Sequence, residues 1–145
     1  MPSQIGRLTR FHTLLLGGNQ LVKLPSSIGQ LVGSQKLSLS GSGLQELPPD
    51  IGSLTSLTYL NLSQTLIKEL PVDMCHLTQL KELNLYENYY LEEIPEAVFE
   101  REPAEMIRYI LAWQQSKRSK TVVEKSKALS PEPEQVKSRE LAIVA

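Results

Sequence analysis

The side chains that could take part in catalysis are few, and the sequence does not bring them together. His12 could act as a general base, but the repeating pattern places no acid beside it. Cys75 and His76 are neighbours in sequence, yet adjacent positions on a turn do not make a nucleophile and its base. Short motifs for phosphate-binding loops, zinc proteases and esterases are missing. We therefore expect no enzyme activity and no catalytic residue.

Metal and cofactor chemistry is equally poorly supported. Two His and one Cys are too few for a site built from several imidazole or thiolate ligands. Glu92, Glu93 and Glu96 follow the last repeat and are interpreted as a solvated acidic rim. Asn61 to Ser63 matches the glycosylation pattern, which we attribute to chance because no secretion signal precedes it. The sequence predicts no metal and no cofactor.

Composition excludes several classes of protein. The chain has 145 residues, of which 41% are hydrophobic and 21% charged, so it can bury a core of about one domain. No segment approaches the ~20 apolar residues of a membrane span, and the first residues do not resemble a signal peptide. The single Cys75 argues against a disulfide-stabilised secreted module. A net charge of −1 does not indicate nucleic acid as a partner. We expect a cytoplasmic protein.

The strongest signal is an internal repeat of 23 residues, aligned on the dipeptide Leu-Pro. Positions 1, 4, 6, 11, 14, 18 and 21 of three full copies are apolar in 20 of 21 cases, with Ser34 as the exception. Since no helix or strand has this period, each copy is expected to form one turn of a coil with these positions buried. The four copies cover residues 11–33, 34–56, 57–79 and 80–99.

Each copy predicts the same local structure. Alternating leucines, such as Leu37 and Leu39, indicate a short strand with one face inward, and stacked copies would pair these strands in parallel. The Leu-Pro segment that follows cannot be a central strand, because proline lacks an N–H donor. The ninth position carries a polar side chain that can bond the main chain where it leaves the strand; these residues are Asn19, Ser42, Thr65 and Asn88.

These residues match the pattern LxxLxLxxNxLxxLPxxIGxL, and the chain resembles the leucine-rich-repeat family over about residues 1–99. The 23-residue LPxxIG form resembles the Ras-pathway scaffold type, the plant Ras-group-related proteins, the cell-polarity adaptors and the repeats of plant disease-resistance proteins. The resemblance implies an α/β leucine-rich-repeat solenoid, a short right-handed coil with a parallel sheet on its concave face. It is far less specific to any function.

The two ends of the repeat region differ. Residues 1–10 match the second half of a repeat, which leaves three alternatives open: a fragment of a longer protein, a shortened family member, or an edge covered by weak self-association. Residues 100–116 are predicted to form a capping helix over the last repeat. Residues 117–145 are predicted to be a flexible basic tail, with Ser130-Pro131 and the terminal ELAIVA of undetermined role.

Function is therefore expected on the concave face. Rigid strands present side chains there, and exposed aromatic residues commonly dominate binding energy, so Tyr59 and Tyr86 are the expected anchors. The resemblance implies a non-enzymatic module that binds a small GTPase, a phosphatase, a kinase or another domain of a signalling protein. The alternative is a regulatory or sensing fragment of a larger signalling enzyme or receptor. The predicted partner-binding residues are His12, Lys36, Tyr59, Asn61, Lys81, Glu82, Asn84, Tyr86 and Glu87.

Overall fold

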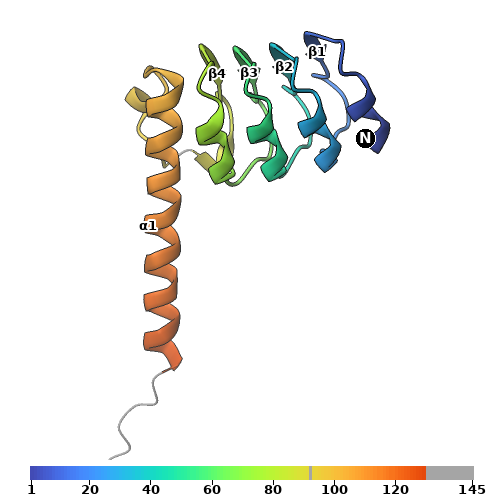
Figure 1. The fold of residues 1–145 in the computed structure, drawn as a ribbon. Helices are drawn as coiled ribbons and strands as arrows, with labels where there is room; N and C mark the ends of the chain where they lie inside the picture. The colour runs from blue at the N-terminus through green and yellow to red at the C-terminus, as the bar shows by residue number, and fades with distance from the viewer. Residues whose placement is uncertain (92, 130–145) are drawn as a thin grey trace, which may run out of the picture. The chain divides into compact units, whose positions relative to one another are not determined.

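Four short strands form one parallel sheet in the order in which they occur along the chain (Figure 1). In this computed structural model, which describes residues 1–91 and 93–129, side chains are described as far as residue 125. Each strand pairs with the equivalent residues of the next copy, so that Leu14 lies beside Leu37, Leu60 and Leu83 in register. The strands are β1 (Thr13–Leu15), β2 (Lys36–Ser38), β3 (Tyr59–Asn61) and β4 (Glu82–Asn84).

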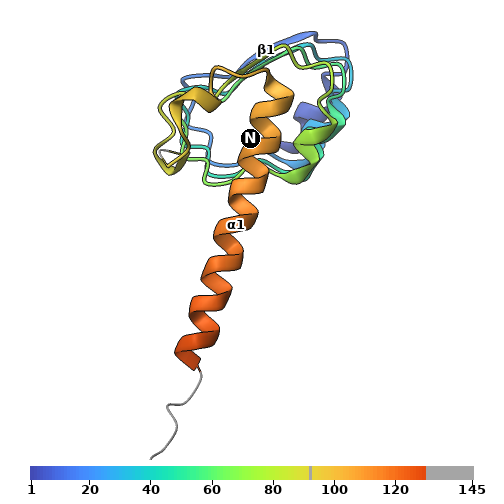
Figure 2. The same cartoon turned by 90° about the vertical axis from the view of Figure 1, so that its left-hand side faces the viewer.

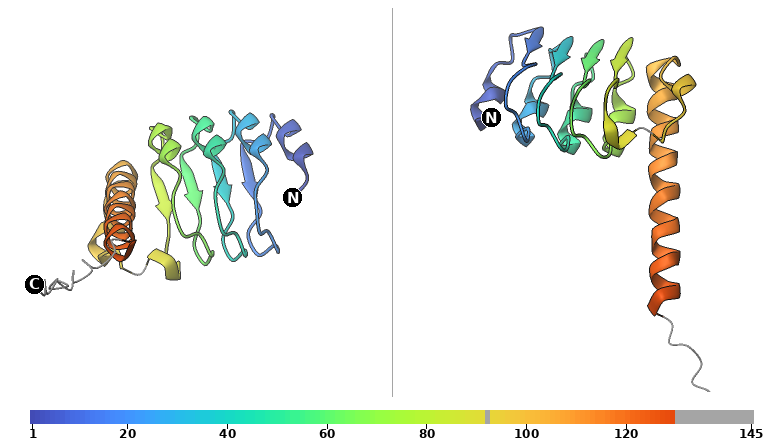
Figure 3. Two further views of the ribbon diagram at one scale, coloured as in Figure 1. Left: turned by 90° about the horizontal axis from the view of Figure 1, so that it is seen from below. Right: turned by 180° about the vertical axis from the view of Figure 1, so that it is seen from behind.

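On the opposite side of the coil, each copy returns through a turn of 3-10 helix (Figure 3). A proline in extended conformation precedes each of the first four turns, because its fixed φ and missing N–H suit the start of a helical turn. A leucine N–H closes each of these turns on the carbonyl three residues earlier. The turns are η1 (Ser3–Arg7), η2 (Ser26–Gln30), η3 (Pro49–Ser53), η4 (Val72–His76), η5 (Tyr89–Leu91) and η6 (Glu96–Val98).

The leucine positions of successive copies stack into one continuous core, and the view along the stack shows the turns overlying one another (Figure 2). All seven predicted positions of the second and third copies are buried. Ser34, the polar exception, is 1% exposed, and its hydroxyl donates a hydrogen bond to the carbonyl of Phe11 over 3.0 Å. The repeat pattern therefore identifies the buried positions of these two copies completely.

The first copy departs from the expected burial. Phe11, predicted to be buried, is 55% exposed, and Leu16 and Leu21 are only partly buried. The prediction for Phe11 is wrong because residues 1–10 contribute the turn η1 but no strand beside β1 on this side. Their apolar side chains Ile5 and Leu8 are themselves partly buried.

The polar ninth position bonds the main chain in every copy, as predicted. Its side chain donates to the carbonyl three residues earlier: Asn19 to Leu16, Ser42 to Leu39, Thr65 to Leu62 and Asn88 to Leu85, over 2.7–3.0 Å. The last two copies are also linked to each other, because the Asn88 Oδ1 accepts from the Thr65 N–H and its Nδ2 donates to Leu62. This polar row satisfies main-chain groups that have no partner from a strand.

The repeats end against helix α1 (Pro103–Leu129), whose first turns bury Met106, Ile107 and Ile110. Pro103 occupies the first helical position, where a missing N–H costs nothing. Gln114 extends the repeat's hydrogen bonding, because its amide accepts from the Leu70 N–H at 2.9 Å and donates to the Leu70 carbonyl at 3.0 Å. The predicted capping role of this helix is therefore supported by both apolar and polar contacts.

The helix is longer than its predicted end at residue 116. The chain divides into two compact units at Gln114, and within the second unit residues 115–129 continue as helix. Lys, Arg, Glu and Ala favour helix there, and neither Gly nor Pro interrupts the chain before Pro131. The described side chains of this part, 115–125, are exposed. Ser130-Pro131 and ELAIVA lie outside the described residues.

Within the part of the chain that the structure describes, no helix has both the length and the apolar character of a membrane span.

Removing the Gln114 amide is expected to weaken the cap. Gln114→Ala leaves the Leu70 N–H and carbonyl without these partners in a buried position, which should lower the free energy of unfolding by about 2 kcal/mol. Urea denaturation followed by circular dichroism measures the change. Gln115→Ala, at the exposed neighbouring position, is the matched control and should stay within about 0.5 kcal/mol of the parent. Equal effects of the two variants would contradict this role for Gln114.

Candidate functional site

The outward side chains of the four strands form two rows across the sheet, which together with the residues flanking each strand we call the open sheet face. The predicted concave face corresponds to this surface. Strand pairing aligns one row as Thr13, Lys36, Tyr59 and Glu82, and the other as Leu15, Ser38, Asn61 and Asn84. Since the sheet sets the spacing, residues of four copies become neighbours although they lie far apart in sequence.

The half of the open sheet face over β1 and β2 is built mainly from small residues. Gly17 and Gly41 flank the strands, and the hydroxyls of Ser38 and Ser40 lie 3.3 Å apart. Leu15 is the exception, with 71% of its surface exposed. His12 precedes β1 and is exposed, and its carbonyl accepts from the main chain of the second copy. Of the nine predicted residues, this half holds His12 and Lys36.

The half over β3 and β4 carries large side chains with defined positions. Tyr59 is half-buried beside Lys36 on one strand and Glu82 on the other. The Asn61 amide donates to the Tyr59 hydroxyl at 3.3 Å, while its Oδ1 accepts from the Ser63 N–H at 3.0 Å. The ring of Tyr59 is thus held by its neighbours along the strand. Tyr59 and Asn61, both among the predicted partner-binding residues, therefore contact each other.

Tyr86 and Glu87 lie where the chain leaves β4. The Asn84 Oδ1 accepts from the Tyr86 N–H at 3.0 Å, and Tyr86 remains 55% exposed. Glu87 has a positive φ of 57° at the position that glycine occupies in the first two copies, and its carboxylate accepts from the Gln64 amide. The structure therefore places Lys81, Glu82, Asn84, Tyr86 and Glu87 on the last strand or beside it.

Phe99, the last residue of the fourth copy, and Arg101 complete this half of the face, and neither was among the predicted binding residues. The Phe99 ring lies 6.2 Å from the Tyr86 ring, centroid to centroid, at an angle of 38°. Arg101 lies over the Tyr109 ring, 5.7 Å from its centroid. The period stops at Ile94-Pro95, so no repeat position predicted where Phe99 and Arg101 would lie. Their only sequence signal was an aromatic and a cationic residue just before the capping helix.

These side chains line an open cavity of about 300 Å³ at the end of the open sheet face, which we call the Tyr59–Phe99 cavity. Its walls come from β3, from β4 and from the segment that leads into α1. Seven of the nine predicted binding residues lie on this half of the face, and five of them line the cavity. The lining residues are Tyr59, Lys81, Glu82, Leu83, Asn84, Tyr86, Phe99, Arg101, Pro103 and Met106.

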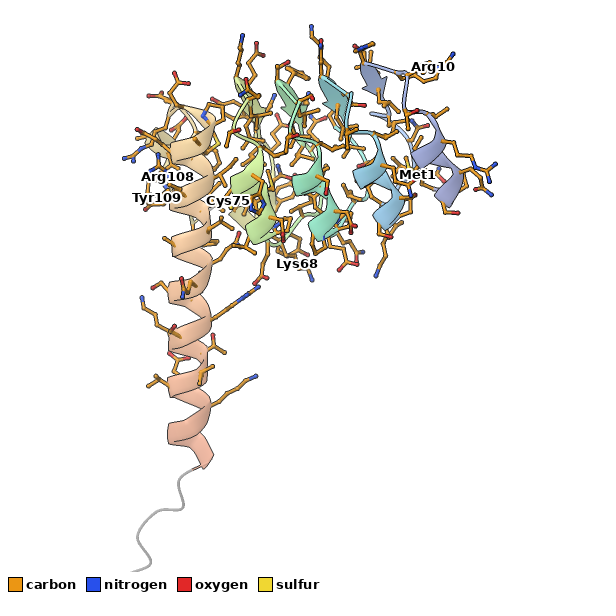
Figure 4. The ribbon with its side chains drawn as sticks, viewed as in Figure 1. Met1, Arg10, Lys68, Cys75, Arg108 and Tyr109 are labelled. Carbon is orange, nitrogen blue, oxygen red and sulfur yellow. The ribbon has the colours of Figure 1, made fainter. Side chains whose placement is uncertain are left out.

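The described residues do not form a metal site or a nucleophile–base pair. Among residues 1–91 and 93–125, no three His, Cys, Asp or Glu side chains are grouped to hold a metal ion. Cys75 is exposed on η4 (Figure 4). The His76 Nδ1 lies 3.0 Å from the Asp73 carbonyl, a main-chain partner rather than the thiol. Glu93 and Glu96 are exposed, and Glu92 lies outside the described residues.

Comparisons with known proteins agree with this architecture. Residues 33–89 match the family described as leucine rich repeat. An LRR protein from Leptospira interrogans is 35% identical, with a TM-score of 0.59 over 61% of this chain. An internalin from Listeria monocytogenes is 23% identical, with a TM-score of 0.55 over 61% of this chain. A comparison with the curated proteins found no significant match.

The fold is therefore an α/β leucine-rich-repeat solenoid with a C-terminal helix, and the matches support a leucine-rich-repeat protein. This chain spans only 22% of the Leptospira protein and 25% of the internalin. Leucine-rich repeats generally mediate contact between proteins.

Proposed function

We propose that this chain is a non-enzymatic module that binds a protein partner through the part of the open sheet face formed by β3 and β4. The observation that carries the proposal is that Tyr59, on β3, and Tyr86, just after β4, line the same cavity of about 300 Å³. Tyrosine is enriched among the residues that dominate binding energy, and such residues cluster in well-packed pockets.

Rigidity of the strands supports the same proposal. The sheet and the hydrogen bonds of Asn61 and Asn84 hold this part of the chain in place before a partner arrives. A surface that is already ordered loses less conformational entropy on binding than a flexible loop. Lys36, Lys81 and Glu82 would contribute mainly to orientation and association rate.

The resemblance to signalling leucine-rich-repeat proteins leads us to propose a cytoplasmic partner: a small GTPase, a phosphatase, a kinase or another domain of a signalling chain. A sensing region of a larger signalling enzyme or receptor is the second candidate. It is favoured by the small share of the matched chains that this sequence spans. Both candidates use the same surface.

Replacing both tyrosines by alanine is expected to weaken partner binding at least about tenfold, because two anchors of the interface are removed. The partner is first identified by affinity capture on the parent chain and mass spectrometry. The dissociation constant is then measured by calorimetry for the parent and for the Tyr59→Ala, Tyr86→Ala double variant. Circular dichroism should be unchanged.

Val32→Ala with Val72→Ala is the matched control, because both valines are exposed and lie outside the open sheet face. This control should bind like the parent. A partner that binds the tyrosine double variant with unchanged affinity would exclude the proposed surface.

A further inference from the structure

Apolar and polar side chains share the lining of the Tyr59–Phe99 cavity, and its apolar part comes from aromatic rings and core residues. Leu83 and Met106 are buried in the core behind it, and Phe99 is partly buried against the same core. Its volume of about 300 Å³ is at the lower end of ligand pockets, which range over ~300–1,000 Å³. A cavity of this size with an apolar part suits a single large side chain better than an extended cofactor.

The rim of this cavity is more cationic than the unit that carries it. Two cations, Lys81 and Arg101, line the cavity against one carboxylate, Glu82, and Lys36 lies beside Tyr59 on the next strand. Residues 1–113 as a whole contain eight Lys and Arg but twelve Asp and Glu, a formal charge of −4. A local excess of positive charge on an acidic unit favours a negatively charged partner.

The two rim cations are available to a partner. Lys81 is exposed, and among the described residues no carboxylate lies within ion-pairing distance of Lys81 or Arg101. The Tyr109 ring holds the Arg101 guanidinium through its π face, which leaves the N–H groups available. The planar guanidinium can donate two parallel hydrogen bonds to a carboxylate.

We propose that the Tyr59–Phe99 cavity receives one large apolar side chain of an acidic segment of the partner, whose carboxylates bind Lys81 and Arg101. This inference rests on the proposed function and adds the chemistry of the partner. The apolar side chain would contact the rings of Tyr59, Tyr86 and Phe99. The flanking carboxylates would select acidic segments over neutral or basic ones.

A phage-displayed library of random dodecapeptides, selected against the full chain, tests this chemistry directly. Enriched peptides are expected to carry a net negative charge and an aromatic residue or leucine next to Asp or Glu. The best peptide is then synthesised, and its affinity is measured by fluorescence anisotropy at low and high salt. Higher salt should weaken binding, because exposed charges are screened.

Three variants separate the contributions to peptide binding. Lys81→Glu with Arg101→Glu should weaken binding at least about tenfold and remove its salt dependence, since two attractions become repulsions. Phe99→Ala should weaken it about fivefold through loss of apolar contact. Arg7→Glu with Arg10→Glu is the matched charge control, because these arginines are exposed near η1, and it should bind like the parent.

Several outcomes would overturn the inference. The selection would contradict it by enriching basic peptides, by enriching peptides without an apolar residue, or by enriching no peptide. Equal affinity of the best peptide for the parent and for the charge-reversed variant would contradict it as well. Capture of the protein partner tests the proposed function independently of this inference. If capture of the protein partner depends on Tyr59 and Tyr86 but not on Lys81, Arg101 or Phe99, the surface is correct and the partner chemistry is wrong.

Discussion

Asn88→Ala is expected to lower the free energy of unfolding by about 4 kcal/mol. Asn88 is 5% exposed, and its amide bonds three main-chain groups: the Leu62 and Leu85 carbonyls at 2.9 and 2.7 Å and the Thr65 N–H at 3.0 Å. Alanine leaves all three buried without these partners, and each such group costs ~1–3 kcal/mol. Urea denaturation followed by circular dichroism measures the loss.

Asn19→Ala is the matched control for this prediction. Asn19 occupies the same position of the first copy and makes the same bond to the carbonyl three residues earlier, but its side chain is exposed. Water can replace the lost amide there, so the expected change is below about 0.5 kcal/mol. Similar losses for the two variants would show that burial does not determine the contribution of this position.

Gly52→Ala is expected to destabilise the fold by about 3 kcal/mol, the upper part of the range for overpacking. Gly52 lies buried in η3 and packs against η4, so an added Cβ would lie about 2.4 Å from the carbonyl oxygen of Asp73 and 2.8 Å from its Cβ. Backbone atoms cannot move aside as a flexible side chain can. The same urea titration measures the effect.

Gly43→Ala is the matched control for steric contact, because the nearest atom to its added Cβ would be the Leu21 carbonyl oxygen at 3.7 Å, an ordinary contact. The loss in free energy of unfolding for Gly29→Ala should lie between those of the two variants, since its Cβ would lie 2.8 Å from the Asp50 carbonyl oxygen. A Gly52→Ala chain as stable as Gly43→Ala would contradict close packing between consecutive turns.

The same contact explains why Cys75 differs from its counterparts. Gly6, Gly29 and Gly52 occupy one position in successive turns, and each lies close to the main chain of the turn that follows. Cys75 occupies this position in η4, where the side chain is exposed. The repeat pattern by itself gives no reason for a larger side chain at this one position. The structure supplies the reason, because the constraint of the following turn is absent there.

The repeat region could be predicted from sequence because its pattern and its structure have the same period. Leucines spaced by one copy must bury the same face, so their recurrence predicted the parallel register, the core of the second and third copies and the polar row ending in Asn88. These interactions join equivalent positions of neighbouring copies. The buried positions of one copy therefore predict the buried positions of the next copy.

The tertiary structure determined the burial and contacts of residues at the two ends of the repeat region, where the 23-residue pattern is incomplete. Phe11 has the sequence of a buried position but lacks a complete neighbouring copy. Phe99 and Arg101 lie after the period stops at Ile94-Pro95, and only the tertiary structure brings the Phe99 ring against Tyr86 and both residues to the same cavity. A periodic pattern cannot place residues outside the period, because their positions depend on contacts with no equivalent elsewhere in the chain. The cavity that distinguishes this binding surface from a plain repeat sheet is formed by such contacts.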